Sequence, residues 1–167
     1  LDDIAAQDMI CYQYPSDTEL MRTGLRGIYL SNFVHWDANH HIELVRSEYG
    51  FEVSDEPFDR TYRVMSNLDD MHENGVHDYL KFIKFGYGRC TDHASKDIRA
   101  GQLSRGQAVE LVRKYDHVKP RDLARWLKYA GMSEETFDGI ADTFRDPRVW
   151  RYIDGTWVKS NLWECGV

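Results

Sequence analysis

Residues 76–95 read VHDYLKFIKFGYGRCTDHAS, and this stretch decides the fold class of the chain. Val76, Leu80 and Ile83 recur at helical spacing, which predicts an amphipathic helix. The following Gly-Tyr-Gly sequence interrupts that helix, because glycine favours turns over helix interiors. A second helix is expected to begin near Cys90. The stretch therefore predicts two helices joined by a short glycine bend, in a mainly helical domain.

Three further helices are expected downstream. Ser104 begins a capping-box pattern, which opens a helix that runs through Tyr115. Pro120 suits the first residue of the next helix, and Gly131 suits its end. Ser133 has the side chain of a helix N-cap and is expected to start the last helix.

Upstream, residues 27–34 read GIYLSNFV, a short apolar run that is rich in β-formers. A nearly continuous apolar run is typical of a parallel strand covered on both faces. Asp37 follows and suits the N-cap of a helix from Ala38 to Tyr49. Residues 51–74 are polar and irregular, and we interpret them as a long loop.

These patterns predict two regions, residues 1–50 and residues 51–167. The first is interpreted as the end of an α/β core, with its last strand at 27–34. The second is interpreted as a helical carboxy-terminal region. One strand cannot form a sheet alone. Either upstream residues supply the other strands, which agrees with a sequence that starts with Leu1 rather than Met, or residues 27–34 are not a strand.

The charge of the chain is unevenly distributed. The formal net charge is −7, but residues 81–128 carry 12 Lys and Arg against five Asp and Glu. A net acidic chain argues against general nucleic-acid binding, whereas a local basic block suggests a polyanionic ligand. The same block is also compatible with solvated helix faces. No apolar run approaches the roughly 20 residues that span a bilayer.

The cysteines do not predict a metal site. Cys11, Cys90 and Cys165 are odd in number, and no pair has the two-residue spacing of a metal knuckle. Reduced thiols in the cytoplasm are the simplest interpretation.

Residues 77–95, extended by residues 97–101, resemble the signature of the N-acetyl sugar amidotransferase family. Residues 24–37 and residues 105–116 are similar to other blocks of the same family, in the same order. Together the three blocks span about two-thirds of the chain, which makes the resemblance more specific than a single short motif.

The resemblance implies an enzyme of the PP-loop ATP pyrophosphatase type, with a Rossmann-like α/β core that uses ATP and Mg²⁺. Such an enzyme is expected to adenylate the acetamido group of an acidic or nucleotide-linked N-acetyl sugar. Ammonia from a partner glutaminase and its cyclase-like companion would then give the acetamidino sugar of a bacterial surface polysaccharide, such as lipopolysaccharide O-antigen. The family's Ser-Gly-Gly-x-Asp-Ser ATP loop is absent here. The chain therefore resembles the carboxy-terminal half, and we expect it to be inactive alone.

The glycine bend and its cations are the predicted binding residues. Lys81, Lys84 and Arg89 flank two glycines, whose backbone N–H groups are able to approach an anion closely. We interpret these cations as contacts to pyrophosphate or to a substrate carboxylate. The alternative is an ordinary helix–helix turn with surface cations beside it.

Three other side chains have predicted roles at the site. Asp92 is a candidate for positioning Mg²⁺ or a sugar hydroxyl, or for capping a helix. His93 is a candidate for moving a proton during ammonia attack, since a free imidazole titrates near neutrality. Asp37 lies just after the predicted strand, where ligands bind in open α/β sheets, although it equally suits an N-cap.

The sequence alone leaves two alternatives to an ATP-dependent amidotransferase. One is a non-catalytic helical module that docks a glutaminase or another partner. The other is a PP-loop ligase that acts on a different amide.

Overall fold

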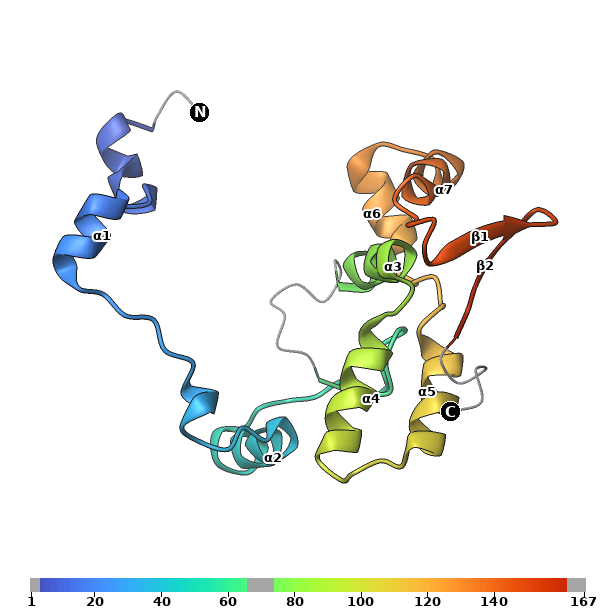
Figure 1. Cartoon of the computed structure of the whole chain (residues 1–167), viewed down its shortest axis with the longest axis horizontal. Helices are drawn as coiled ribbons and strands as arrows, with labels where there is room; N and C mark the ends of the chain where they lie inside the picture. The colour runs from blue at the N-terminus through green and yellow to red at the C-terminus, as the bar shows by residue number, and fades with distance from the viewer. Residues whose placement is uncertain (1–3, 66–73, 162–167) are drawn as a thin grey trace. The chain divides into compact units, whose positions relative to one another are not determined.

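The computed structural model describes residues 4–65 and 74–161. The chain divides into two units, residues 1–41 and residues 42–167. The described residues are mainly helical, as the sequence predicts, with one two-stranded sheet (Figure 1).

Short helices make up the first unit. Its elements are η1 (Ala6–Tyr12), α1 (Asp17–Thr23) and η2 (Leu30–Asn32). A capping box formed by Ser16 and Glu19 begins α1, and Gly24, with a φ of 65°, ends it.

The prediction of a strand at residues 27–34 is wrong. Residues 30–32 form the 3₁₀ helix η2 instead. A strand needs a neighbour to satisfy its backbone N–H and C=O groups, and the described part of the chain pairs no strand with this segment. The assignment of residues 1–50 to an α/β core stays a prediction.

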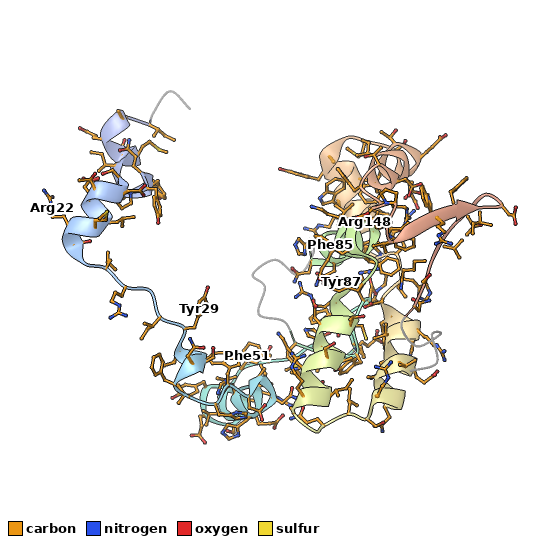
Figure 2. The ribbon with its side chains drawn as sticks, in the orientation of Figure 1. Arg22, Tyr29, Phe51, Phe85, Tyr87 and Arg148 are labelled. Atoms are coloured by element: carbon orange, nitrogen blue, oxygen red, sulfur yellow. The ribbon has the colours of Figure 1, made fainter. Side chains whose placement is uncertain are left out.

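Large apolar side chains of the first unit are exposed. Tyr29 is 80% exposed, Phe33 73% and Trp36 63%, and Tyr29 projects away from the ribbon (Figure 2). Large exposed apolar patches occur on surfaces that bind proteins, membranes or ligands.

Helix α2 (Ala38–Tyr49) has the predicted bounds. The Asp37 carboxylate accepts hydrogen bonds from the backbone N–H groups of Asn39, at 3.0 Å, and His40, at 3.2 Å. The bond from His40 is the main cause that lowers the pKa of Asp37. Asp37 therefore acts as a helix cap, one of the two roles expected of it.

Five helices form the second unit beyond the loop. Their bounds are α3 (Asn74–Phe85), α4 (Arg89–Arg99), α5 (Arg105–Tyr115), α6 (Leu123–Ala130) and α7 (Glu134–Asp142). The predicted caps Ser104 and Ser133 are confirmed, since each hydroxyl accepts a backbone N–H of its helix. Helix α6 begins at Leu123 rather than Pro120, because a turn closed by Leu123 N and Pro120 O comes first.

Two apolar clusters hold these helices together. The first joins α3, α6 and α7 through the buried residues Val76, Ile83, Leu123, Leu127, Phe137 and Ala141. The second joins α4 and α5, which lie side by side (Figure 1), through Cys90, Ala94, Ala108 and Val112. Burial raises the pKa of the Cys90 thiol to about 12, so this cysteine is an unreactive core residue.

A β-hairpin that we did not predict follows α7. Strands β1 (Trp150–Ile153) and β2 (Thr156–Lys159) pair antiparallel. The turn residues Asp154 and Gly155 both have positive φ values, 48° and 79°. Asp-Gly between two β-prone runs is a strong hairpin signal, so the sequence did contain the information.

The described part of the predicted loop, residues 51–65, has no regular strand and packs against α4 and α5. Its Ser54 N–H donates to Val64 O at 2.8 Å. Arg63 and Tyr62 both bond to the buried Asp97 of α4. Among the described helices of both units, none is long and apolar enough to cross a bilayer.

Candidate functional site

The glycine bend between α3 and α4 surrounds an anion, but that anion belongs to the protein. The carboxylate of Asp116, at the end of α5, accepts the Gly88 N–H at 2.8 Å and the Thr91 N–H at 3.1 Å. The Thr91 hydroxyl donates to the same carboxylate at 2.5 Å. Asp116 is buried, so these bonds fasten the bend to α5.

Glycine is required at both positions of the bend. Gly86 has a φ of +76°, and a Cβ there would lie 2.5 Å from Val149 Cγ1. A Cβ on Gly88 would lie 2.9 Å from the Asp116 carboxylate. The bend therefore needs glycine for its turn and for the close approach of Asp116.

Two of the predicted binding cations are paired with carboxylates. Arg89 donates from Nε and Nη2 to both oxygens of Asp78, at 2.9 and 2.7 Å. Lys81 forms an ion pair with Asp92. The side-chain hydrogen bonds that Arg89 donates to Asp78 raise the pKa of Arg89, which keeps this guanidinium charged.

Lys84 lies apart from these pairs. Its side chain is exposed, and Nζ lies 5.1 Å from the centre of the Phe85 ring. Phe85 and Tyr87 lie where α3 passes into α4 (Figure 2), and both line an apolar cavity of about 570 Å³ beside α5.

The described residues of the bend do not fit a polyphosphate or its metal. The backbone donors of Gly88 and Thr91 are used by Asp116, and Lys81 and Arg89 already face carboxylates. No group of three or more His, Cys, Asp or Glu side chains within residues 4–65 and 74–161 is arranged to hold a metal ion. The phosphate-binding role of these cations remains a prediction without support from their contacts.

A second cavity, of about 250 Å³, brings two predicted site residues together. We call it the polar cavity. It lies between the loop, α3, α4 and the start of α6, and it includes Arg89 and His93; Lys81, Lys84 and Asp92 do not line it. The lining also contains Arg60, Thr61, Asp78, Asp59, Arg121 and Asp122.

His93 is held in the polar cavity by the loop. Its Nδ1 lies 2.7 Å from the hydroxyl oxygen of Thr61. Burial is the main cause that lowers the pKa of His93 to about 4, and the nearby cations Arg63 and Arg89 add to the effect. The imidazole is therefore neutral at pH 7, which removes the near-neutral titration on which its proposed proton-transfer role depended.

This pKa makes stability depend on pH in a defined direction. Between pH 6.5 and about 4, the unfolded chain protonates His93 and the folded chain does not. Stability should therefore fall as the pH is lowered through this window, by up to about 3 kcal/mol from this residue.

Comparison of wild type with His93→Asn, by urea unfolding at pH 7 and pH 4.5, measures the contribution of His93. We expect the variant to lose less stability on acidification than wild type. Equal losses in the two proteins would contradict the assigned pKa. His117→Asn, at an exposed histidine, is the matched control.

Four residues that organise the site were not identified from the sequence. Arg60 is only 2% exposed and donates to the backbone carbonyls of Val118 and Asp116. Burial lowers its pKa to about 10, so it stays charged at pH 7. Thr61, Asp78 and Asp116 are likewise buried. Asp78 and Asp116 lie within blocks that resemble the family, but no local pattern gave any of the four a role, because each acts through a contact distant in sequence or on the next helix.

The fold and its polar cavity define a mainly helical domain with a charged, partly enclosed cavity. A family model described as "LPS biosynthesis protein WbpG-like, C-terminal domain" matches residues 47–163. The chain therefore belongs to the WbpG-like family of lipopolysaccharide biosynthesis proteins. A search of curated proteins gave no match.

Proposed function

We propose that this chain is the sugar-binding, carboxy-terminal part of an ATP-dependent amidotransferase of lipopolysaccharide biosynthesis. The enzyme would convert the acetamido group of an N-acetyl sugar to an acetamidino group, with ammonia as the nitrogen donor. One observation carries the proposal. Asp78, Arg89 and His93 all belong to the signature stretch of residues 77–95, and all three line the polar cavity.

The lining of the polar cavity suits a sugar better than a polyphosphate. Three arginines, Arg60, Arg89 and Arg121, are matched by three carboxylates, so the lining offers both hydrogen-bond donors and acceptors without a large net charge. Its volume of about 250 Å³ lies below the ~300 Å³ at which pockets for drug-sized ligands begin. That size favours one sugar ring over an entire nucleotide sugar.

This proposal changes the roles of the predicted residues. Arg89 and His93 are proposed to face the sugar, and Asp78 holds the Arg89 guanidinium in position. Lys81 and Asp92 are proposed to brace α3 against α4 through their ion pair. ATP and Mg²⁺ are proposed as cofactors of the complete enzyme, and no step assigned to the residues described here involves them.

The remaining elements of the proposal concern the complete enzyme. We propose that residues 25–36 pack into its Rossmann-like α/β PP-loop core, because their apolar side chains are exposed here without cover. A glutaminase and a cyclase-like subunit are proposed to supply ammonia, and the cytoplasm is the proposed location. An acidic or nucleotide-linked N-acetyl sugar is the proposed substrate.

One observation favours a second candidate, a non-catalytic docking module. The same exposed apolar residues 25–36 would serve equally well to bind a partner protein. A docking module would not need the polar cavity, so substitutions inside it would leave the activity of the assembly unchanged. A PP-loop ligase that acts on another amide would share the cavity but prefer a different substrate.

Turnover by the complete enzyme tests the proposal. Candidate N-acetyl sugars are supplied with ATP and ammonium, and AMP, pyrophosphate and the mass of the product are measured. We expect His93→Ala to lower turnover at least about tenfold, since one hydrogen-bonding group in a closed site commonly contributes that much. His117→Ala, in the apolar cavity, should leave turnover within about twofold. Equal activity of the two variants would favour the docking module.

A further inference from the structure

The contact between Thr61 and His93 joins two parts of the chain across the polar cavity. Thr61 comes from the loop and is only 3% exposed, and its hydroxyl oxygen lies 2.7 Å from His93 Nδ1. The loop fixes this threonine, since its N–H donates to Phe58 O at 3.1 Å. His93 is carried by α4, so the relative position of the two side chains is set by ordered backbone on both sides.

The direction of the hydrogen bond between the Thr61 hydroxyl and His93 Nδ1 determines which imidazole nitrogen carries the proton. A hydroxyl has one proton to donate, and buried polar groups are almost always hydrogen-bonded. The Arg63 N–H approaches the Thr61 oxygen at 3.4 Å, so this neighbour is a donor and not an acceptor. Within the described residues, His93 Nδ1 is the acceptor that the Thr61 hydroxyl reaches. Thr61 therefore donates, and Nδ1 accepts.

A neutral imidazole that accepts at Nδ1 carries its proton on Nε2. We propose that Thr61 is a positioning residue that locks His93 in this tautomer. His93 then presents a fixed, uncharged Nε2–H donor to an acceptor oxygen of the ligand, such as a sugar hydroxyl or amide carbonyl. The assignment of the ligand rests on the proposed function, whereas the tautomer rests on the contacts alone. His93 thereby differs from a general acid or base, because it polarises an oxygen without exchanging its proton.

The charged groups around His93 keep the ring neutral. Arg63 approaches from the loop, and Arg89 and Lys96 approach from α4; all three disfavour a second proton on the ring. Asp92 is the nearby group that favours it, and its carboxylate is already paired with Lys81. The cations and the burial of the ring outweigh Asp92, which leaves the Nε2–H donor uncharged at pH 7.

Nitrogen NMR of the histidine rings in the full chain, without any ligand, tests the tautomer. Two-bond couplings between ring protons and ¹⁵N identify which nitrogen carries the proton at pH 7. We expect His93 to be protonated at Nε2 and unprotonated at Nδ1. A proton mainly on Nδ1, or a doubly protonated ring, would overturn the proposal.

Two variants test the role of Thr61. Thr61→Val removes the hydroxyl at nearly constant shape, and we expect a mixture of both neutral tautomers. Thr61→Ser keeps the hydroxyl but removes the methyl group, and it should give the wild-type spectrum. If Thr61 acted only through its methyl group, Thr61→Ser would not give that spectrum. If Thr61→Val prevents folding, the wild-type and Thr61→Ser spectra decide the question. If Thr61→Ser keeps the Nε2–H tautomer of His93 but loses turnover, that result would count against the proposed function and not against this inference.

Discussion

Asp116→Ala is expected to lower the free energy of unfolding of the helical unit by about 3–5 kcal/mol. The substitution removes the acceptor of the Gly88 and Thr91 N–H groups and of the Thr91 hydroxyl. It also removes the carboxylate that most favours the charged form of the buried Arg60. The loss is large against the 5–15 kcal/mol that is typical of a whole domain.

Urea unfolding followed by circular dichroism measures this effect. Asp138→Ala is the matched control, because Asp138 is a partly exposed carboxylate paired with Lys119 and should contribute less than about 1 kcal/mol. Thr91→Val removes one of the bonds to Asp116 and should cost about 1–2 kcal/mol. If Asp116→Ala is no more destabilising than Asp138→Ala, the carboxylate does not hold the bend.

The second large effect is expected at the pair formed by Asp78 and Arg89. Arg89→Ala leaves the carboxylate of Asp78, which is 7% exposed, without the guanidinium that donates to both of its oxygens. We expect a loss of about 3 kcal/mol in stability, because the buried carboxylate loses its charged partner and keeps its desolvation cost, with His77 Nδ1, at 3.1 Å, as its remaining contact. Arg89→Lys should recover part of the loss, since a lysine keeps the charge but not the fork of two donors.

A double-mutant cycle separates the pairing from other consequences of each substitution. Asp78→Ala, Arg89→Ala and the double variant are unfolded in urea, and we expect a coupling energy above about 1.5 kcal/mol. The exposed pair Arg113 and Glu110 is the control, with an expected coupling below about 0.5 kcal/mol. A coupling energy between Asp78 and Arg89 as small as the control value would show that this ion pair does not stabilise the fold.

Local sequence signals predicted the helices well. Helix α2 has the predicted bounds, and Ser104 and Ser133 cap α5 and α7 as expected. These predictions succeeded because capping bonds join residues only two or three positions apart. Residues 27–34 were misassigned because β-propensity reports suitability for a sheet, and a strand forms only where a neighbour is present.

The candidate site was predicted only in part. Arg89 and His93 line the polar cavity, but the sequence did not reveal that Asp116 fills the glycine bend or that Asp78 pairs with Arg89. Asp116 lies 28 residues from Gly88, and neither residue has a local pattern that points to the other. The cations near the bend led us to expect a bound ligand anion. In the structure Lys81 and Arg89 pair with Asp92 and Asp78, and composition does not distinguish a phosphate from a carboxylate of the same chain.

A crystal structure of the complete protein with its N-acetyl sugar would test the central claim most directly. We expect one sugar ring inside the polar cavity, with an acceptor oxygen on His93 Nε2 and a hydroxyl beside the paired Asp78 and Arg89. A sugar bound instead at the glycine bend or in the apolar cavity, with nothing in the polar cavity, would contradict it.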